Sequence, residues 1–447
     1  MMHFRLRRHL CSALFSMDRS IALECVSGTK EMADNPIPLV IVEGFLGSAG
    51  AAMGSKFTEY LDRGSKEYPS RRTLFASVGP VSSLHDRACE LFYTLLGGAV
   101  DYGEGHAEAH GHQRYGRVVD NALYPSWSLD SPLHFLGHSM GGPTIVKLQS
   151  LMAAGFFGDR GHPDMVLSLT AVSAPFRGTQ LVYALGERTD TAPAVRPFSA
   201  GAILSRIIHV LSYLSPLLPA ALDLHAESRC LSYRDASLPC LWRQLCKSDW
   251  AQSRDATPYD ATFQAAEERE VDGEGQPHQR TFYRSYSASL RHTERDRSYR
   301  DFIANILSPL YISSLIMSSF NFSVLQPTTL AIVASVSSSG TEARYPDRPP
   351  ENDSPGREHY YWENDGVVPV FSQFHPFGCS TALCRHHSKR THTVTGRPYP
   401  GIWCVYALED ASHFSIAPFW WGSRRQRAFW LELGNWLWAI DHHRLIL

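Results

Sequence analysis

Residues 133–142 read LHFLGHSMGG, an apolar run that passes into a glycine-rich turn. The first four residues have the pattern of a short buried strand, and PTIVKLQSLMAAGF after the turn has the pattern of a helix. Between them Gly137, Ser139 and Gly141 form the motif G-x-S-x-G. Glycines on either side let a strand turn sharply into a helix and leave the serine hydroxyl exposed. The stretch predicts a nucleophilic serine, with an ordinary glycine-rich turn as the alternative.

Two further apolar runs flank this motif in the sequence. PIPLVIVEGFLG at 36–47 reads as a first strand that ends in a turn, and VLSLTAVSAP at 166–175 reads as a later one. Strands that alternate with helical stretches are typical of a parallel sheet. We therefore expect an α/β fold with a mostly parallel central sheet flanked by helices.

A nucleophilic serine needs a base within hydrogen-bond reach and a carboxylate that orients the base. In this arrangement the acid follows the serine in the chain and the histidine follows the acid. Asp365 in YWENDGVV (361–368) is our candidate acid, and His413 in WCVYALEDASHFSIAPF (403–419), ahead of a final helix AFWLELGNWLWAI, is our candidate base. Without the serine motif, a turn aspartate and one loop histidine among 21 would be the simpler interpretation.

The composition excludes some classes of protein. The chain has 447 residues, of which 44% are hydrophobic and 19% charged, with a formal net charge of -2, so it has no basic stripe for nucleic acid. No window holds the roughly 18 uninterrupted apolar residues of a membrane-spanning helix. Nine scattered cysteines do not indicate a disulfide scaffold. Residues 1–35 read as a targeting segment or a disordered extension, which leaves the compartment open.

The segment DYGEGHAEAHGHQRYGR at 101–117 holds three histidines and no apolar periodicity, so we expect a loop there. Asp86 precedes it on a stretch that reads as helical. Imidazole and carboxylate together suit Zn²⁺, although sets with cysteine are more usual. From the spacing alone, a metal site and a solvated polar loop both stay open.

Several stretches together resemble one family. They are VEGFLG, the segment from VGPVSSLHDRAC to GHQRYGR, the serine motif, TAVSAPFRGTQLV, RDATPYD, ENDGVV and the region from PGIWCVY to the last helix. They are similar to the thermoalkalophilic bacillus and staphylococcal true lipases, α/β-hydrolases with a bound zinc ion. The resemblance implies a serine lipase or carboxylesterase that acts on acylglycerols or other esters, with Ser139, Asp365 and His413 as catalytic residues and the backbone N–H groups of Phe45 and Met140 as oxyanion donors.

The resemblance also assigns zinc ligands position by position. Asp86 in LHDRAC, His106 and His112 in GHAEAHGH, and Asp255 in RDATPYD match the family's set. His110 is outside this set and either orients a ligand or is simply exposed. A zinc ion held by these residues would be structural and would pin a small insert to the body of the hydrolase.

Two departures from the family pattern affect the expected chemistry. The family's calcium site loses its acid, because Ser415 follows His413 where a glutamate is expected and APFWWGS follows in place of further ligands, so we do not expect calcium. Before Phe45 the family has histidine-glycine, whereas this chain has Glu43 and Gly44. Glu43 either slows acylation by its charge or is neutralised by a nearby arginine.

The resemblance further implies a lid over an apolar acyl groove. Leu204, Ile207, Ile208, Leu211 and Leu214 form an apolar stripe at helical spacing, which otherwise reads as a core helix. Such a lid contacts a lipid surface transiently. The expected organisation is an extension (1–35) and one α/β-hydrolase domain (36–447), with a zinc-binding insert from about 84–117 and 249–260 and a lid at about 180–245.

Other features leave alternatives. Cys379, Cys384, His386, His387 and His392 form a second cluster that reads either as a variable exposed loop or as a zinc knuckle. Residues 262–300 and 337–357 are polar or proline-rich and read as insertions or loops. The alternative to an enzyme is a catalytically weak or silent, zinc-stabilised scaffold that binds lipid or protein. The sequence does not separate a lipase from an esterase or an acyltransferase.

Overall fold

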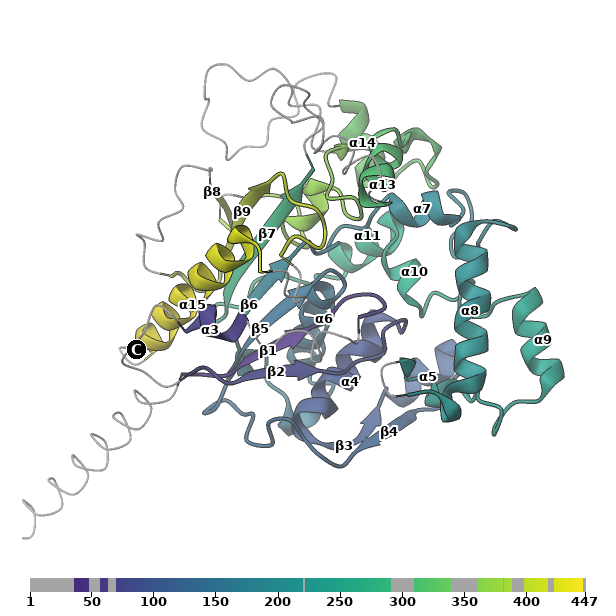
Figure 1. Cartoon of the computed structure of the whole chain (residues 1–447), viewed down its shortest axis with the longest axis horizontal. Coiled ribbons are helices and arrows are strands. Elements are labelled where there is room, and N and C mark those ends of the chain that lie inside the picture. Colours follow the sequence, from purple (N-terminus) through teal and green to yellow (C-terminus); the bar gives the residue numbers. More distant parts are fainter. Residues whose placement is uncertain are drawn as a thin grey trace, which may run out of the picture.

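The computed structural model describes residues 36–47, 57–62, 70–219, 222–290, 309–338, 361–380, 382–387, 398–416 and 422–444. The predicted N-terminal extension at 1–35 lies outside the described residues, as do most of 337–357 and His392. Figure 1 shows one central sheet, with helices on both of its sides and a group of helices beyond one edge of the body.

The central sheet has seven strands in the order β2-β1-β5-β6-β7-β9-β8, and each neighbouring pair is parallel. The expected α/β class is therefore confirmed. The strands are β1 (Leu39–Val42), β2 (Thr73–Ala76), β5 (Leu133–His138), β6 (Val166–Val172), β7 (Phe282–Ser289), β8 (Cys384–His387) and β9 (Trp403–Glu409). A separate antiparallel pair is formed by β3 (Gly98–Asp101) and β4 (Tyr115–Val119).

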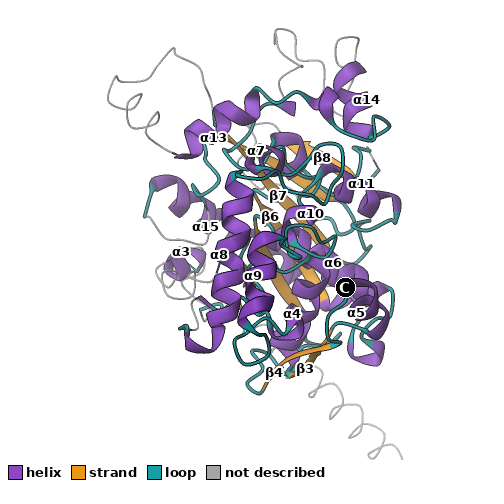
Figure 2. Cartoon of the chain, turned by 90° about the vertical axis from the view of Figure 1, so that its right-hand side faces the viewer, coloured by secondary structure: helices purple, strands orange, loops and turns teal. Residues whose placement is uncertain are grey.

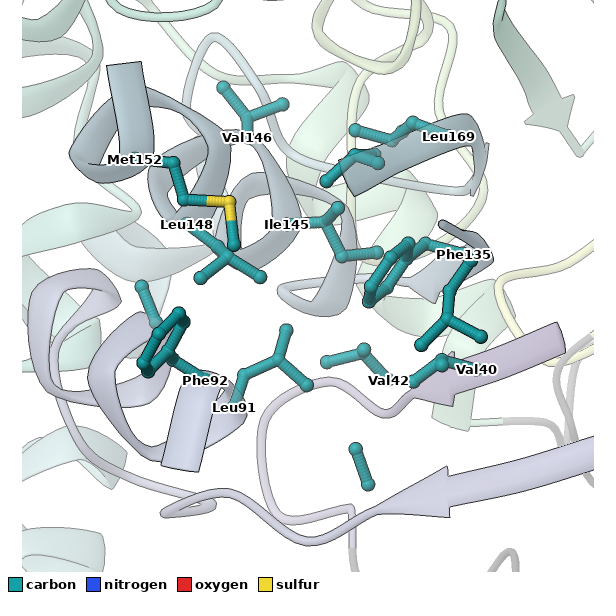
Figure 3. Close-up of a cluster of buried hydrophobic side chains, with 14 of the residues drawn as sticks. Val40, Val42, Leu91, Phe92, Phe135, Ile145, Val146, Leu148, Met152 and Leu169 are labelled. Atoms are coloured by element: carbon teal, nitrogen blue, oxygen red, sulfur yellow. The ribbon is translucent and has the colours of Figure 1, made fainter. Parts of the chain in front are cut away.

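Alternation along β1 explains why both faces of the sheet are covered, since successive side chains of a strand point to opposite faces. Val40 and Val42 lie in the apolar cluster with α4 (Leu84–Leu96) and α6 (Gly141–Ala153), which Figure 3 shows in close-up. Leu39 and Ile41 lie in a second cluster, with α3 (Thr58–Leu61) and α15 (Arg424–Arg444). A strand that is apolar throughout is typical of a parallel sheet buried on both sides.

The remaining helices form the periphery. Figure 2 shows α8 and α9 next to each other on the face that is turned toward the viewer. The set comprises α5 (Glu104–His110), α7 (Leu181–Leu185), α8 (Ala200–Leu214), α9 (Leu238–Cys246), α10 (Thr257–Asp260), α11 (Phe263–Val271), α13 (Pro309–Ser318) and α14 (Ala331–Ser338).

Two expectations from the sequence are wrong. Residues 104–110 form the short helix α5, which ends at Gly111 with a φ of 70°, whereas a loop was expected. Residues 262–300 contain α11 and the sheet strand β7, whereas an insertion or loop was expected. Both segments lack the apolar periodicity of an exposed helix or a core strand.

One helical stretch within the described ranges, Ala200–Leu217, meets the length and apolarity that a membrane span requires, and 28% of it is buried in the molecule. A single stretch of this kind is weak evidence of a span. It includes α8, which packs against the protein on its inner side through Ile208.

The stacking of Trp430 on Phe57, with ring centroids 4.1 Å apart, joins α15 to the segment that begins α3. We expect Trp430→Ala to lower the free energy of unfolding by roughly 3–5 kcal/mol, because it removes a fully buried aromatic ring and leaves a cavity. Trp242→Ala on α9 is the control: its side chain is exposed, so a change within about 0.5 kcal/mol is expected. Urea unfolding would measure both, and similar losses in the two variants would contradict this account of the packing.

Candidate active site

Ser139 lies at the turn between β5 and α6, with a positive φ of 53°. Its N–H donates to the carbonyl of Val172 at 2.9 Å, so the end of β6 holds the turn. At Gly141 a Cβ would lie 2.0 Å from the carbonyl oxygen of Val42, so only glycine fits there. The predicted strained turn is therefore present, and three strands meet at it.

Asp365 and His413 form a buried hydrogen-bonded pair near this turn. His413 Nδ1 donates to Asp365 Oδ2 at 2.9 Å, and the backbone N–H of His413 donates to the carbonyl of Asp365 at 2.9 Å. Asp365 Oδ1 accepts hydrogen bonds from the N–H groups of Val367 (2.9 Å) and Val368 (2.8 Å). Asp365 is fully buried and His413 is 3% exposed. Four hydrogen bonds thus fix the carboxylate and the orientation of the imidazole.

The position of each group in the sheet explains why they meet. His413 follows β9, as expected. Asp365 does not follow a strand directly in the chain, but the N–H of Leu290, just after β7, donates to the carbonyl of Asn364. The candidate serine, acid and base therefore lie beyond the carboxyl ends of β5, β7 and β9, which is where parallel sheets bind ligands.

His138, the residue before Ser139, supports His413 and was not predicted. Its Nε2–H donates to the carbonyl of His413 at 2.9 Å, and the two rings lie 4.9 Å apart. Burial lowers the pKa of His138 to about 3, so the ring stays neutral. Within the described residues, Ser139 and His413 are not hydrogen-bonded to each other. In enzymes without substrate this contact is often long and forms in the substrate complex.

The two expected oxyanion donors both face the same pocket as Ser139. Among the described residues, the N–H groups of Phe45 and Met140 donate no hydrogen bond to another protein group. At Gly44 a Cβ would lie 2.6 Å from Ser139 Cβ, so a residue with a side chain would not fit and the backbone of the loop after β1 lies directly against the serine. Two unused donors beside a serine are what an oxyanion site requires.

Glu43 lies beside this loop, and Arg87 is the cation near it. Arg87 Nη2 donates to the backbone carbonyl of Glu43, Nη1 to that of Gly79 at 2.8 Å, and Nε to Thr144 Oγ1 at 2.8 Å. Burial lowers the pKa of Arg87 to about 10, which still leaves it charged at neutral pH. These three donors bind two backbone carbonyls and a hydroxyl and tie the loop after β1 to α6, while the neutralisation of the Glu43 charge stays a prediction.

An apolar cavity of about 130 Å³ opens at Ser139. Its walls come from the oxyanion loop, the segments around α7, α8 and α10, and the loop that follows Asp365. They include Phe45, Leu181, Val182, Leu185, Leu204, Trp250, Pro258 and Val367. Among the described residues that line the cavity, Glu187 is the ionisable one. Its carboxylate oxygen Oε1 accepts a hydrogen bond from the backbone N–H of Ala194 at 2.8 Å. The cavity suits an apolar chain attached to a group at the serine.

Helix α8 covers part of this cavity. Leu204, Ile208 and Leu211 pack with Phe45 and Trp250, so one side of the helix closes over the loop after β1. The other side of α8 carries apolar residues that are exposed to solvent, and the turn after α8 and helix α9 carry more of them. The exposed residues are Ile203, Ile207, Val210, Leu217, Leu238 and Trp242. The predicted apolar stripe is thus divided, because Ile207 points outward while its neighbours pack inward.

The four expected zinc ligands come together beside α4 and α5. Their ligand atoms all lie within 4.8 Å of one another. His106 Nε2 lies 3.3 Å from Asp86 Oδ1 and 3.2 Å from Asp255 Oδ1, and His112 Nε2 lies 3.4 Å from Asp255 Oδ2. Arg229, which the sequence reasoning did not identify, donates to both carboxylates.

The donor set fits a metal ion. Asp86 Oδ1, His106 Nε2 and His112 Nε2 are buried and have no hydrogen-bond partner within the described residues. His112 Nδ1 donates to the carbonyl of Gln113 at 2.8 Å, which directs the Nε2 lone pair toward the group. His110 is not in the group but packs on His106 with centroids 4.6 Å apart.

Comparison with known proteins finds similarity to lipases. A family described as the lipase-like, C-terminal domain matches residues 35–197. A lipase of Staphylococcus hyicus is 30% identical over 314 residues, which cover 64% of this chain and 46% of that protein. Lipase 2 of Staphylococcus aureus is 34% identical over 179 residues, which cover 34% of this chain and 25% of that protein. The chain is thus similar to staphylococcal lipases over much of its length.

The chain spans less than half the length of these two staphylococcal lipases. Among solved structures, S. hyicus lipase matches with a TM-score of 0.64 and 22% identity over 92% of this chain and 97% of that chain. Lipase 1 from Pelosinus fermentans matches with a TM-score of 0.59 and 21% identity over 90% and 98%. The likeness to these two lipase structures shows the fold, which is of the α/β-hydrolase type.

Glu187 gives the site a pH dependence. Burial raises the pKa of its carboxyl from 4.5 to about 7. Between these values the folded chain keeps a proton that the unfolded chain has released, so the free energy of unfolding falls as pH rises through this window. Compared with Glu187→Gln, the wild type should lose about 1–3 kcal/mol between pH 5 and pH 7. Urea unfolding of both proteins at the two pH values measures this difference; parallel pH profiles would contradict it.

Proposed function

We propose that this protein is a serine ester hydrolase that cleaves acylglycerols or other carboxylic esters through an acyl-enzyme on Ser139. The observation that carries the proposal is the Asp365–His413 pair, which is buried and hydrogen-bonded at 2.9 Å. This pair lies at the carboxyl ends of the strands, as does the strained Ser139 turn. A binding scaffold would have no need for these three groups in this arrangement, so the silent alternative is not favoured.

In the proposed mechanism Ser139 Oγ attacks the ester carbonyl while His413 Nε2 takes the hydroxyl proton. Asp365 holds the imidazole in the tautomer that has Nδ1 protonated and stabilises the imidazolium that forms. His413 then gives the proton to the leaving alcohol, and the acyl group remains on Ser139. Water, deprotonated by His413, attacks the acyl-enzyme and releases the carboxylic acid.

The oxyanion of each tetrahedral intermediate would be held by the N–H groups of Phe45 and Met140. Each donor of this kind contributes about 100-fold or more to the rate. The Arg87 guanidinium holds the carbonyl of Glu43 and so keeps the oxyanion loop in place. Its charge also offsets that of the Glu43 carboxylate, which otherwise opposes the developing negative charge.

We assign the apolar cavity to the acyl chain and α8 to the lid. Movement of α8 away from Phe45 would open the cavity, and the exposed apolar residues of α8 and α9 would contact a lipid surface. In this assignment the hydrolase domain is 36–447, the lid region is about 180–245, and the insert is contributed by about 84–117 and 249–260.

The structural metal in this proposal is Zn²⁺, held by Asp86, His106, His112 and Asp255. The ion supplies a cross-link between α4, α5 and the segment before α10, and no step of the reaction uses it. Calcium is not part of the proposal.

Hydrolysis of p-nitrophenyl esters from acetate to palmitate tests the activity. Ser139→Ala should lower the rate by about 10⁴-fold or more, because the nucleophile is lost. Ser150→Ala on the same helix α6 is the matched control and should keep the wild-type rate. A maximum at long chains indicates a lipase and one at acetate or butyrate an esterase. Equal, negligible rates for all three proteins would refute the hydrolase proposal.

Metal analysis tests the zinc assignment. We expect Asp86→Asn/Asp255→Asn to remove one zinc ion per chain and to lower the thermal midpoint, since both carboxylate ligands lose their charge and Arg229 loses both partners. Asp101→Asn, whose carboxylate pairs with Arg114 outside this group, is the control. An unchanged zinc content in the double variant would exclude this ligand set.

A further inference from the structure

A second group of metal-ligand side chains lies at the edge of the sheet, apart from the residues considered so far. His375 and Cys379 come from the loop after the short helix η10 (Val370–Gln373), and Cys384 and His386 come from β8. Figure 1 shows β8 beside β9, and β8 is the last strand in the order of the seven-stranded sheet. The four ligand atoms lie within 4.8 Å of one another.

The pleat of β8 explains why two of these residues act together. Successive side chains alternate between faces, so Cys384 and His386 share one face while His387 lies on the other. His387 stacks on Tyr406 with ring centroids 4.5 Å apart. His387, one member of the cluster considered from the sequence, is therefore excluded by the strand, and His375 takes a place that the sequence reasoning did not give it.

The loop folds back over this face. The N–H of Cys384 donates to the carbonyl of Ser380 at 2.9 Å, and the N–H of Ser380 donates to Cys384 Sγ at 3.4 Å. This turn brings Cys379 against the strand. Cys379 Sγ lies 3.4 Å from Nε2 of His375 and 3.4 Å from Nε2 of His386.

These separations match a tetrahedral site. With Zn–S and Zn–N bonds of ordinary length, neighbouring sulfur and nitrogen ligands lie about 3.5 Å apart. Cys379 and Cys384 are not joined in a disulfide. Two sulfurs and two imidazole nitrogens form the donor set that selects zinc among the common divalent ions.

The surroundings orient the ligands in advance. His375 Nδ1–H donates to the carbonyl of Phe377 at 2.8 Å, which leaves its Nε2 lone pair directed at the sulfurs. The same ring stacks on Phe377 at 4.3 Å, and the edge of Phe374 packs against His386 at 4.8 Å. His375 and Cys384 are each 1% exposed. A carbonyl partner on the far nitrogen of a histidine is typical of metal ligands.

We propose that His375, Cys379, Cys384 and His386 bind a structural Zn²⁺ ion. Four protein ligands close the coordination sphere, so the site has no open position for a substrate. The ion fastens the edge strand β8 to the loop that follows η10. In that helix Gln373 Nε2 donates to the carbonyls of Ala288 on β7 and Val368, so the site fixes the outer end of the segment that carries Asp365. This proposal stands independently of the proposed function.

Metal analysis of the full chain is the first test. The double variant Cys379→Ser/Cys384→Ser should carry one zinc ion fewer per chain than the wild type. Cys240→Ser/Cys246→Ser, on α9 and outside the group, is the matched control and should keep the wild-type content. Asp86→Asn/Asp255→Asn should leave this ion in place. Equal zinc contents in the wild type and the Cys379/Cys384 variant would overturn the proposal.

A second measurement needs no variant. Replacement of zinc by Co²⁺ in the wild-type protein should give a thiolate-to-cobalt charge-transfer band in the near ultraviolet, which a site of carboxylates and imidazoles alone does not give. The band should be absent in the Cys379→Ser/Cys384→Ser variant if that variant folds. Cobalt uptake without the band would refute the site, and so would an intact mass that shows a Cys379–Cys384 disulfide in the native protein.

Discussion

At Ser139 the chain leaves β5 and enters α6 with a left-handed backbone, which costs a non-glycine residue roughly 1–3 kcal/mol. Contacts with the surrounding strands stabilise this conformation. The carbonyl of Val172 accepts the N–H of Ser139, and the first turn of α6 lies directly against the carbonyl of Val42. The close approach of α6 to β1 depends on this turn. A side chain at Gly141 would separate the helix from the sheet.

The other polar groups of the site also lie at the carboxyl ends of the strands. Asp365 is fully buried, yet its two oxygens accept hydrogen bonds from His413, Val367 and Val368. A carboxylate in such a place is stabilised by these donors instead of by water. His138 adds a hydrogen bond to the backbone of His413. The imidazole is thus held through its ring and through its main chain, and Nε2 is the ring nitrogen that the proposed mechanism uses as the base.

Some of this could be read from the sequence because the signals are local. The strands β1, β5 and β6 are apolar runs, and the G-x-S-x-G motif marks the turn that follows β5. Strand β7 was missed because Arg284 and its serine neighbours are polar. Their burial depends on tertiary partners: Arg284 lies over the rings of Tyr406 and Trp436 and donates to Tyr286.

Other parts depend on contacts that no local pattern encodes. Helix α5 forms between a glycine at each end and packs its histidines toward Asp86 and Asp255. His375 joins the sheet-edge cysteines only because the chain turns back at Ser380. Family resemblance supplied the ligands of the first metal group, whereas it offered nothing for the second.

Arg229 ends the short helix η6 (Glu227–Arg229), which lies in the connection between α8 and α9, and it donates to Asp86 and Asp255 on the body. The helix pair is therefore fixed to the protein between its two members. Arg206 on α8 also donates to the carbonyl of Leu245 on α9, so the two helices form one unit. Arg229 therefore joins the proposed lid to the first metal group, so a change at the two carboxylates would also reach the helices that cover the cavity.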